Sequence, residues 1–150
     1  MINYNHNMFS ESVKHSIQAM MHLAENDGKL IMVSHIAENY DIPKHYLAKL
    51  VQTLSKHHLI KSVQGRNGGI QLNKPPSEIK IIDIIHAIDG PPPEHETCVF
   101  GLDKCSDQVP CPIHSDWKKM KLQLEDKLFN RNLDDLNKEL QKKHKLLQSS

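Results

Sequence analysis

Several features that define other classes of protein are scarce in this sequence. No apolar run reaches the roughly 18 residues that a membrane-spanning helix needs, so no such helix is predicted. The first residues lack the basic start, apolar stretch and small-residue cleavage site of a secretory signal. We therefore expect a cytoplasmic protein, in a reducing compartment where disulfides are uncommon.

The motifs of common enzymes are missing as well. The chain has no Cys-x-x-Cys pair, no nucleotide-binding glycine loop and no group of carboxylates arranged for catalysis. Aromatic residues make up 5% of the 150 residues and charged residues 25%, which is typical of a folded domain and not of a disordered one. A chain of this length can form one core without disulfide support. We expect one small folded unit that is not an enzyme.

Acidic residues are absent from positions 42–77. The net charge of that segment is +6, against −3 for residues 1–41 and −2 for residues 78–150. Basic side chains gathered without local acids are what neutralisation of DNA phosphates requires, so the segment predicts a DNA-contacting face. The alternative is a solvated surface that lacks acids by chance. Its six basic residues are Lys44, Lys49, Lys56, Lys61, Arg66 and Lys74.

Periodic apolar residues predict three helices in the first part of the chain. They recur every three or four positions in residues 10–24, in residues 32–40 and after Pro43. Ser10 or Ser12 is suited to cap the first helix. The second and third helices are short and joined by a tight turn, and the third is basic, which predicts a helix-turn-helix.

Two short β-favouring runs follow the third helix. Residues 59–63 and 69–72 flank a loop whose Gly and Asn residues can take positive φ, which is typical of a hairpin. A hairpin directly after a recognition helix is a wing. The expected fold is mainly α with a small β-wing: a winged helix-turn-helix domain over residues 8–89, followed by a long C-terminal dimerisation helix.

The second half of the chain contains a long loop between helices. Residues 79–88 are apolar nearly all round, as in a helix packed in a core or between two subunits. Residues 90–112 form a loop longer than most compact domains tolerate, and such loops are often functional. Residues 113–147 are expected to form an amphipathic helix through which the chain makes a homodimer, then a short helix followed by a ragged tail. The predicted dimer face holds Trp117, Met120, Leu124 and Leu128.

All three cysteines lie in or at the end of this loop, as Cys98, Cys105 and Cys111, and His114 follows closely. Four soft or borderline ligands so close in sequence can meet at one centre, and thiolates select iron–sulfur clusters, zinc or cuprous copper. Zinc suits the ligand chemistry, although structural zinc sites usually contain a closely spaced Cys pair that this chain lacks. The remaining alternative is three buried thiols beside a solvated His114.

The combination of these segments resembles a known family. The recognition-helix segment IPKHYLAKLVQTL, the wing SVQGRNGGIQL, the helix ending in HAIDG and the three late cysteines are similar to winged-helix iron–sulfur regulators, a family that includes the cluster assembly regulator IscR and the nitric-oxide-sensing repressor NsrR. The resemblance covers roughly residues 8–140. It implies that Cys98, Cys105 and Cys111 hold an iron–sulfur cluster within a loop at residues 90–112.

The fourth ligand distinguishes branches of that family. In the IscR-like branch a His three positions after the last Cys completes the site, and His114 matches it. NsrR-like members can use an Asp near the start of the partner's first helix, where this chain has Lys14, with Glu11 one turn earlier. The resemblance therefore favours His114 as the fourth ligand and a two-iron cluster over a four-iron cluster. IscR has a Glu after the Tyr-Leu pair where this chain has Ala48, so its dual operator specificity is not expected here.

The predicted function is that of a DNA-binding transcriptional repressor. We expect its operator affinity to be controlled by an iron–sulfur cluster that senses nitric oxide, redox state or iron–sulfur status. The alternative is a regulator that uses thiol oxidation or zinc and holds no such cluster. A homodimer would place recognition helices in major grooves and wings along minor grooves. The candidate DNA contacts are Lys44, His45, Tyr46 and Lys49 of the recognition helix and Lys61, Gln64 and Arg66 of the wing, with Arg66 suited to minor-groove insertion.

Overall fold

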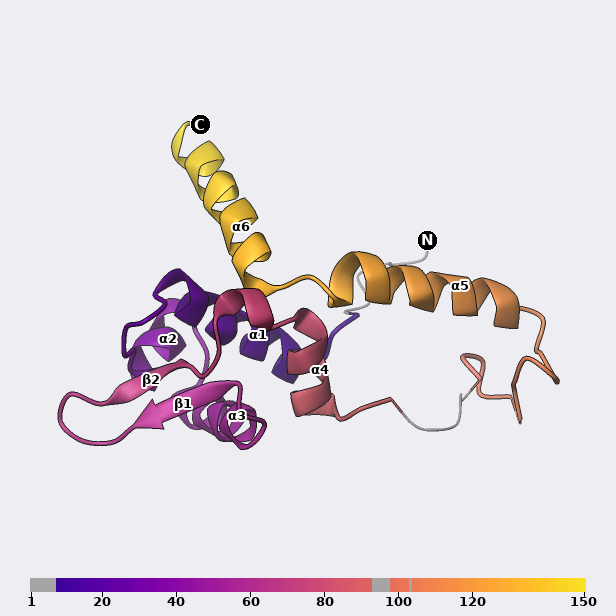
Figure 1. Ribbon diagram of the computed structural model, residues 1–150, viewed down its shortest axis with the longest axis horizontal. Coiled ribbons are helices and arrows are strands. Elements are labelled where there is room, and N and C mark those ends of the chain that lie inside the picture. Colours follow the sequence, from indigo (N-terminus) through magenta and orange to yellow (C-terminus); the bar gives the residue numbers. More distant parts are fainter. Residues whose placement is uncertain (1–7, 93–97, 103) are drawn as a thin grey trace.

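A computed structural model describes residues 8–92, 98–102 and 104–150, and within them the protein is mainly helical with one small sheet (Figure 1). This confirms the predicted fold class. None of the described helices is both long and apolar enough to cross a membrane. The elements are α1 (Glu11–Glu25), α2 (Val33–Asn39), α3 (Lys44–Lys56), β1 (Ile60–Val63), β2 (Gly69–Leu72), the 3-10 turn η1 (Pro76–Glu78), α4 (Ile81–Asp89), α5 (His114–Leu124), the π-helical turn η2 (Glu125–Phe129) and α6 (Leu133–Gln148).

One apolar core joins α1, α2, α3, α4, the sheet and the start of α6. Helix α1 is central to it: Val13 and Ser16 are buried in its first half, and in its second half residues 19–24 are buried all round the helix. Its first turn is capped by Ser10, whose Oγ accepts a hydrogen bond from the Val13 amide at 3.2 Å. The bulkiest side chains of the core are Met20, Leu23, Ile36, Leu47, Leu54, Ile79, Ile84 and Leu133.

The helix-turn-helix consists of α2, a tight turn and α3. Asp41 in the turn has φ 53°, a left-handed conformation that Asp tolerates better than most residues. Ile42 beside it is buried and holds the turn against the core. Helix α3 begins directly after Pro43, and its apolar face packs inward through Leu47 and Leu54. The opposite, basic face of α3 is therefore left toward solvent.

The wing is the antiparallel pair β1 and β2, in the register Ile60 with Leu72 and Val63 with Gly69. Figure 1 shows the loop between the two strands extending away from the helices. Ile31, just before α2, forms a further antiparallel bridge with Ile70. Because the wing is bonded to the start of the helix-turn-helix, these two parts are held in a fixed arrangement.

Replacing Gly68 by Ala is expected to destabilise the wing. A Cβ on Gly68 would lie 2.1 Å from the Val63 carbonyl oxygen, and backbone cannot yield as a flexible side chain can. We expect a loss of about 1–3 kcal/mol in the free energy of unfolding, which a urea titration measures. Asn67→Ala, one residue away on the exposed loop, is the control and should unfold as the wild type does. Equal midpoints for both variants would contradict the close approach.

A second prediction concerns the buried His22 of α1. Burial lowers the pKa of this imidazole and the nearby His35 lowers it further, while Glu25 opposes them. The unfolded chain therefore takes up a proton more readily than the folded protein, so stability is present above the ordinary pKa of 6.5 and falls as the pH drops below it. Thermal unfolding between about pH 5 and 7.5 measures this. We expect His22→Gln to reduce the slope and the exposed His144→Gln to leave it unchanged; equal slopes in all three proteins would contradict the prediction.

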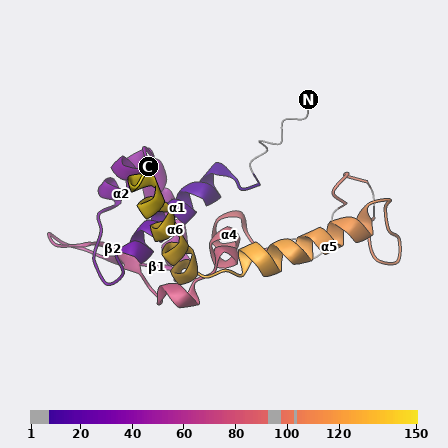
Figure 2. The same cartoon turned by 90° about the horizontal axis from the view of Figure 1, so that it is seen from above.

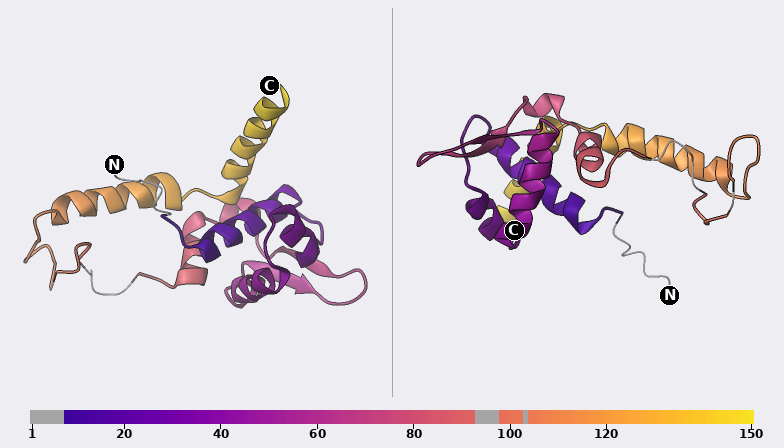
Figure 3. Two further views of the ribbon diagram at one scale, coloured as in Figure 1. Left: turned by 180° about the vertical axis from the view of Figure 1, so that it is seen from behind. Right: turned by 90° about the horizontal axis from the view of Figure 1, so that it is seen from below.

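Two backbone hydrogen bonds join the segment before α4 to the segment before α6. The Ile81 amide donates to the Arg131 carbonyl at 3.1 Å, and the Leu133 amide donates to the Ile79 carbonyl at 2.9 Å. Between these points α5 extends away from the helical body, as the views in Figures 1, 2 and 3 all show. The π-helical turn η2, which the sequence analysis did not predict, follows α5 and packs Phe129 against the core.

Helix α6 corrects one prediction. A short helix followed by a ragged tail is wrong, because α6 continues to Gln148. Asn132 caps it by accepting a hydrogen bond from the Asp135 amide at 2.9 Å, and Asp134 pairs with Lys138 one turn later at 2.7 Å. Acids in the first turn and Lys145 in the last also complement the helix dipole. These local interactions extend a helix whose second half has few apolar residues to bury.

Candidate DNA-binding face and cysteine site

The basic residues predicted on the recognition helix lie at the surface. Lys44, His45 and Lys49 of α3 are exposed. In the wing, Lys61 on β1 and Arg66 in the loop are exposed too, together with Gln64. The outward face of α3 and the wing thus provides donors that can reach DNA phosphates or base edges.

A hollow joins the two halves of this face. Lys44 at the start of α3 lines it from one side, and Gln64 and Arg66 from the other. Met32 and Ser34, at the beginning of α2, complete its wall. Sequence reasoning missed these last two residues, because periodicity assigns them to a helix without showing that its start lies beside the wing. The structure therefore brings together three of the predicted contacts from separate elements.

Tyr46 has a different environment from its neighbours on α3. It is half-buried, its hydroxyl lies 2.7 Å from Ser12 Oγ, and its ring meets the His15 ring edge-on at a centroid distance of 5.6 Å. These contacts tie the recognition helix to the first turns of α1. A role of Tyr46 at the DNA stays a prediction. Its contacts with α1 are a second, structural role that the sequence did not predict.

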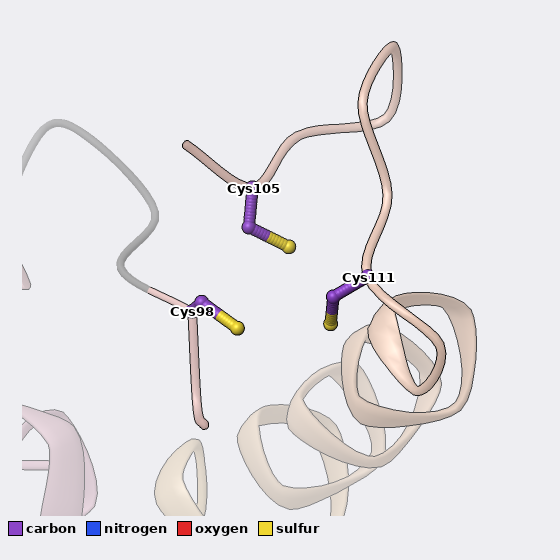
Figure 4. Close-up of side chains that lie close together, drawn as sticks. All are labelled: Cys98, Cys105 and Cys111. Carbon is purple, nitrogen blue, oxygen red and sulfur yellow. The ribbon is translucent and has the colours of Figure 1, made fainter. Parts of the chain in front are cut away.

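The three cysteines converge although they are far apart in the loop. Figure 4 shows Cys98, Cys105 and Cys111 directing their side chains into one space from separate stretches of chain. All three Sγ atoms lie within 4.8 Å of one another, and the thiols are free. A tetrahedral ion with metal–sulfur bonds of about 2.3 Å would hold its sulfurs about 3.8 Å apart. The geometry therefore fits thiolate ligands of one metal centre.

Hydrogen bonds within the loop help to give two of the thiols different pKa values. Burial raises the pKa of Cys98, but backbone hydrogen bonds from Phe100 and Leu102, with further hydrogen bonds from the other two thiols, outweigh it and lower the pKa. For Cys105 a backbone hydrogen bond from Cys111 lowers the pKa, while burial and the neighbouring thiol charges together raise it above its usual value. Cys98 thus ionises more readily than Cys105, and the thiolate is the form that binds metal.

His114, the predicted fourth ligand, lies at the edge of the sulfur group. Its Nδ1 is 3.0 Å from Cys105 Sγ, and the residue is buried at the first position of α5. Its Nε2 is 3.0 Å from Asp107 Oδ1, and Lys118 binds the other oxygen of that carboxylate at 2.5 Å. Sequence reasoning missed Asp107 and Lys118. The spacing of His114 and Lys118 by one helical turn was an available signal, but nothing in the pattern indicated Asp107.

A helix-turn-helix with a basic outward helix, followed by a wing in the same frame, defines the class of winged-helix DNA-binding proteins. The chain belongs to the Rrf2 family: the family model described as "Iron-dependent Transcriptional regulator" matches residues 9–139. This confirms the resemblance to winged-helix regulators on which the sequence analysis relied.

Individual relatives agree with the family. A candidate HTH-type transcriptional regulator of Aquifex aeolicus is 36% identical over 131 residues, which cover 86% of this chain and 90% of that protein. CymR, the global cysteine regulator of B. subtilis, has a TM-score of 0.74 at 25% identity and matches over 92% of this chain and 98% of CymR. IscR of T. potens has a TM-score of 0.72 at 29% identity over 92% of this chain and 91% of IscR. The chain is therefore a transcriptional regulator, in agreement with the expectation that it is not an enzyme.

Proposed function

We propose that this regulator binds its operator with an affinity controlled by an iron–sulfur cluster on Cys98, Cys105 and Cys111. The observation that carries the proposal is the convergence of the three sulfurs within 4.8 Å in a chain whose fold reads DNA. Thiolates are the ligands that iron–sulfur clusters select. Similarity to IscR, and the description of the family as iron-dependent, support iron as the metal.

Residues of the loop and of α5 would bind such a centre and line its pocket. When bound, the cluster supplies a redox-active centre that oxygen and nitric oxide can attack, which gives the regulator its signal. The three thiolates anchor it, and His114 is the proposed fourth ligand, which favours a two-iron over a four-iron cluster. Trp117 and Lys121 of α5 line the same small pocket as the three cysteines. Repression of transcription is the outcome we expect at the operator.

A homodimer in the cytoplasm is the proposed working form. Met120 and Leu122 on α5 are more than half exposed, and α5 extends away from the body of its own chain. An apolar groove between α1, η2 and α6 offers a surface of matching chemistry, lined by Phe9, Ile17, Met21, Leu128, Leu136 and Leu140. Burial of these faces between two copies would pair two recognition helices for a palindromic operator. The cysteine loop leads directly into α5, so a change at the cluster would act on the dimer contact.

The test is to purify the protein anaerobically and to count iron and acid-labile sulfide per chain alongside a visible absorption spectrum. Broad visible absorption with matched iron and sulfide is expected. Operator binding by the cluster-loaded and cluster-free forms should then differ by about 5- to 150-fold, the usual range of coupling between two sites. A colourless protein, or equal binding by both forms, would overturn control by a cluster and leave the DNA-binding function standing.

A second candidate function is a regulator that responds through thiol oxidation or through zinc. Two observations favour it: the sulfur separation also suits a single tetrahedral ion, and CymR, named as a regulator of cysteine, is as similar in fold to this chain as IscR is. Elemental analysis that finds zinc, or mass spectrometry that finds a disulfide formed on exposure to peroxide, would support this candidate over the first.

A further inference from the structure

The imidazole of His114 is held from both of its nitrogen atoms. Nδ1 lies 3.0 Å from Cys105 Sγ, on the side of the sulfur group, and Nε2 lies 3.0 Å from Asp107 Oδ1, on the opposite side. The ring itself is only 8% exposed. Its two edges therefore meet groups of different chemistry, a thiol on one side and a carboxylate on the other.

The carboxylate of Asp107 is also held from both of its oxygens. Oδ1 meets His114, and Oδ2 lies 2.5 Å from the Nζ of Lys118, one turn further along α5. The hydrogen bond from Lys118, followed by the one from His114, holds the pKa of Asp107 below its usual range. The group is thus a charged acceptor, and it links the cysteine loop to the first two turns of α5.

These contacts select one tautomer of the imidazole. A neutral imidazole has one N–H donor and one acceptor nitrogen, and a carboxylate can only accept. Nε2 therefore carries the hydrogen that is donated to Asp107, which leaves the lone pair of Nδ1 directed toward the sulfurs. A histidine that binds a metal commonly donates its other N–H to a carboxylate, which fixes the ring and raises its basicity.

We propose that Asp107 is a positioning residue, which orients His114 so that Nδ1 faces the cysteine site, and that Lys118 holds Asp107 in place. The inference rests on the proposed function for its physiological metal, but its geometry concerns any metal bound by the three thiolates. Asp107 and Lys118 have side chains 68% and 43% exposed, and exposed ion pairs contribute little to stability. The contact is therefore expected to matter for metal binding and not for folding.

The experiment titrates Co²⁺ alone into the cluster-free, reduced full-length protein under anaerobic conditions and follows the visible d–d absorption. Asp107→Ala should weaken Co²⁺ binding about 10- to 100-fold, the usual cost of losing such a partner. Asp107→Asn, whose amide oxygen can still accept from Nε2, should fall between Asp107→Ala and the wild type, and Lys118→Gln should shift binding in the same direction. His114→Ala should alter the absorption bands, since a nitrogen ligand is lost. Asp116→Asn and Lys119→Gln, exposed on the same helix, are the matched controls and should leave binding unchanged.

The outcomes separate this inference from the proposed function. Unchanged Co²⁺ affinity in Asp107→Ala, His114→Ala bands identical to those of the wild type, or a wild type that binds no Co²⁺ would each overturn the inference. Bands and affinities that depend on His114 and Asp107 would support it even if the purified protein holds no iron–sulfur cluster. Circular dichroism melting curves of the variants should overlay that of the wild type, and a large loss of stability would show that Asp107 is structural instead.

Discussion

Replacing Cys111 by Ser is expected to abolish the metal centre. The serine oxygen is a hard ligand and remains protonated at neutral pH, so it cannot take the place of a thiolate. Cys111 also hydrogen-bonds to both other thiols and lies three positions before the first residue of α5, so its loss removes a ligand and disturbs the other two. Iron and sulfide per chain should fall to background, and the visible absorption should disappear.

The same variant tests how the centre acts on DNA. Its operator affinity should equal that of wild-type protein stripped of its metal, because both lack the centre while the reading face is intact. Ser115→Ala, exposed on α5, is the control and should retain full iron content. Wild-type levels of iron and sulfide in Cys111→Ser would remove this residue from the ligand set.

Replacing Arg66 by Ala is expected to weaken operator binding by about 5- to 150-fold, equivalent to the roughly 1–3 kcal/mol typical of a specific contact. Arg66 lies on the exposed wing loop, on the opposite wall of the hollow from Lys44. The side chain is exposed, so its loss should not affect folding. Fluorescence anisotropy with a labelled operator measures the change.

Lys49→Ala tests a second residue of the same face through the salt dependence of operator affinity. If Lys49 binds a phosphate, affinity should fall to a similar extent for all sequences, and the slope of log affinity against log salt should decrease by about one. Lys142→Ala on the exposed part of α6 is the control for net charge alone and should change neither quantity. Wild-type affinity in both Arg66→Ala and Lys49→Ala would show that DNA lies against another face.

The DNA-reading half of the fold was accessible from the sequence because its signals are local. The second strand of the wing was predicted within its observed bounds, and Ser10 was named as a candidate cap of the first helix, because alternation and capping depend on near neighbours in the chain. The bridge between Ile31 and Ile70 was not predictable in this way, since it pairs residues far apart in sequence. Nor was the hollow between the start of α2 and the wing predictable.

In the cysteine site, too, local features could be predicted from the sequence and the three-dimensional arrangement could not. Its soft ligands could be identified from residue types and spacing, since no other cysteines are available in the chain. That their sulfurs meet within 4.8 Å depends on how a loop without regular structure turns, which periodicity does not describe. Asp107 lies in that loop among other polar residues, so only the positions of its two oxygens distinguish it. The length of α6 was underestimated because its second half has few apolar residues, so periodicity gives little signal there.

The hydrogen bonds between the strand-like segments before α4 and before α6 have an evolutionary consequence. The chain departs at Ile81 and returns at Arg131, and these two points are bonded to each other. The segment between these points therefore has both of its ends hydrogen-bonded to each other. Exposed loops closed in this way tolerate insertions and deletions at little cost in stability. Within this stretch α4 packs in the core and Phe129 packs against it, while α5 extends away from the helical body. Over evolution, the region of α5 can therefore change in length while the helix-turn-helix and the wing keep their arrangement.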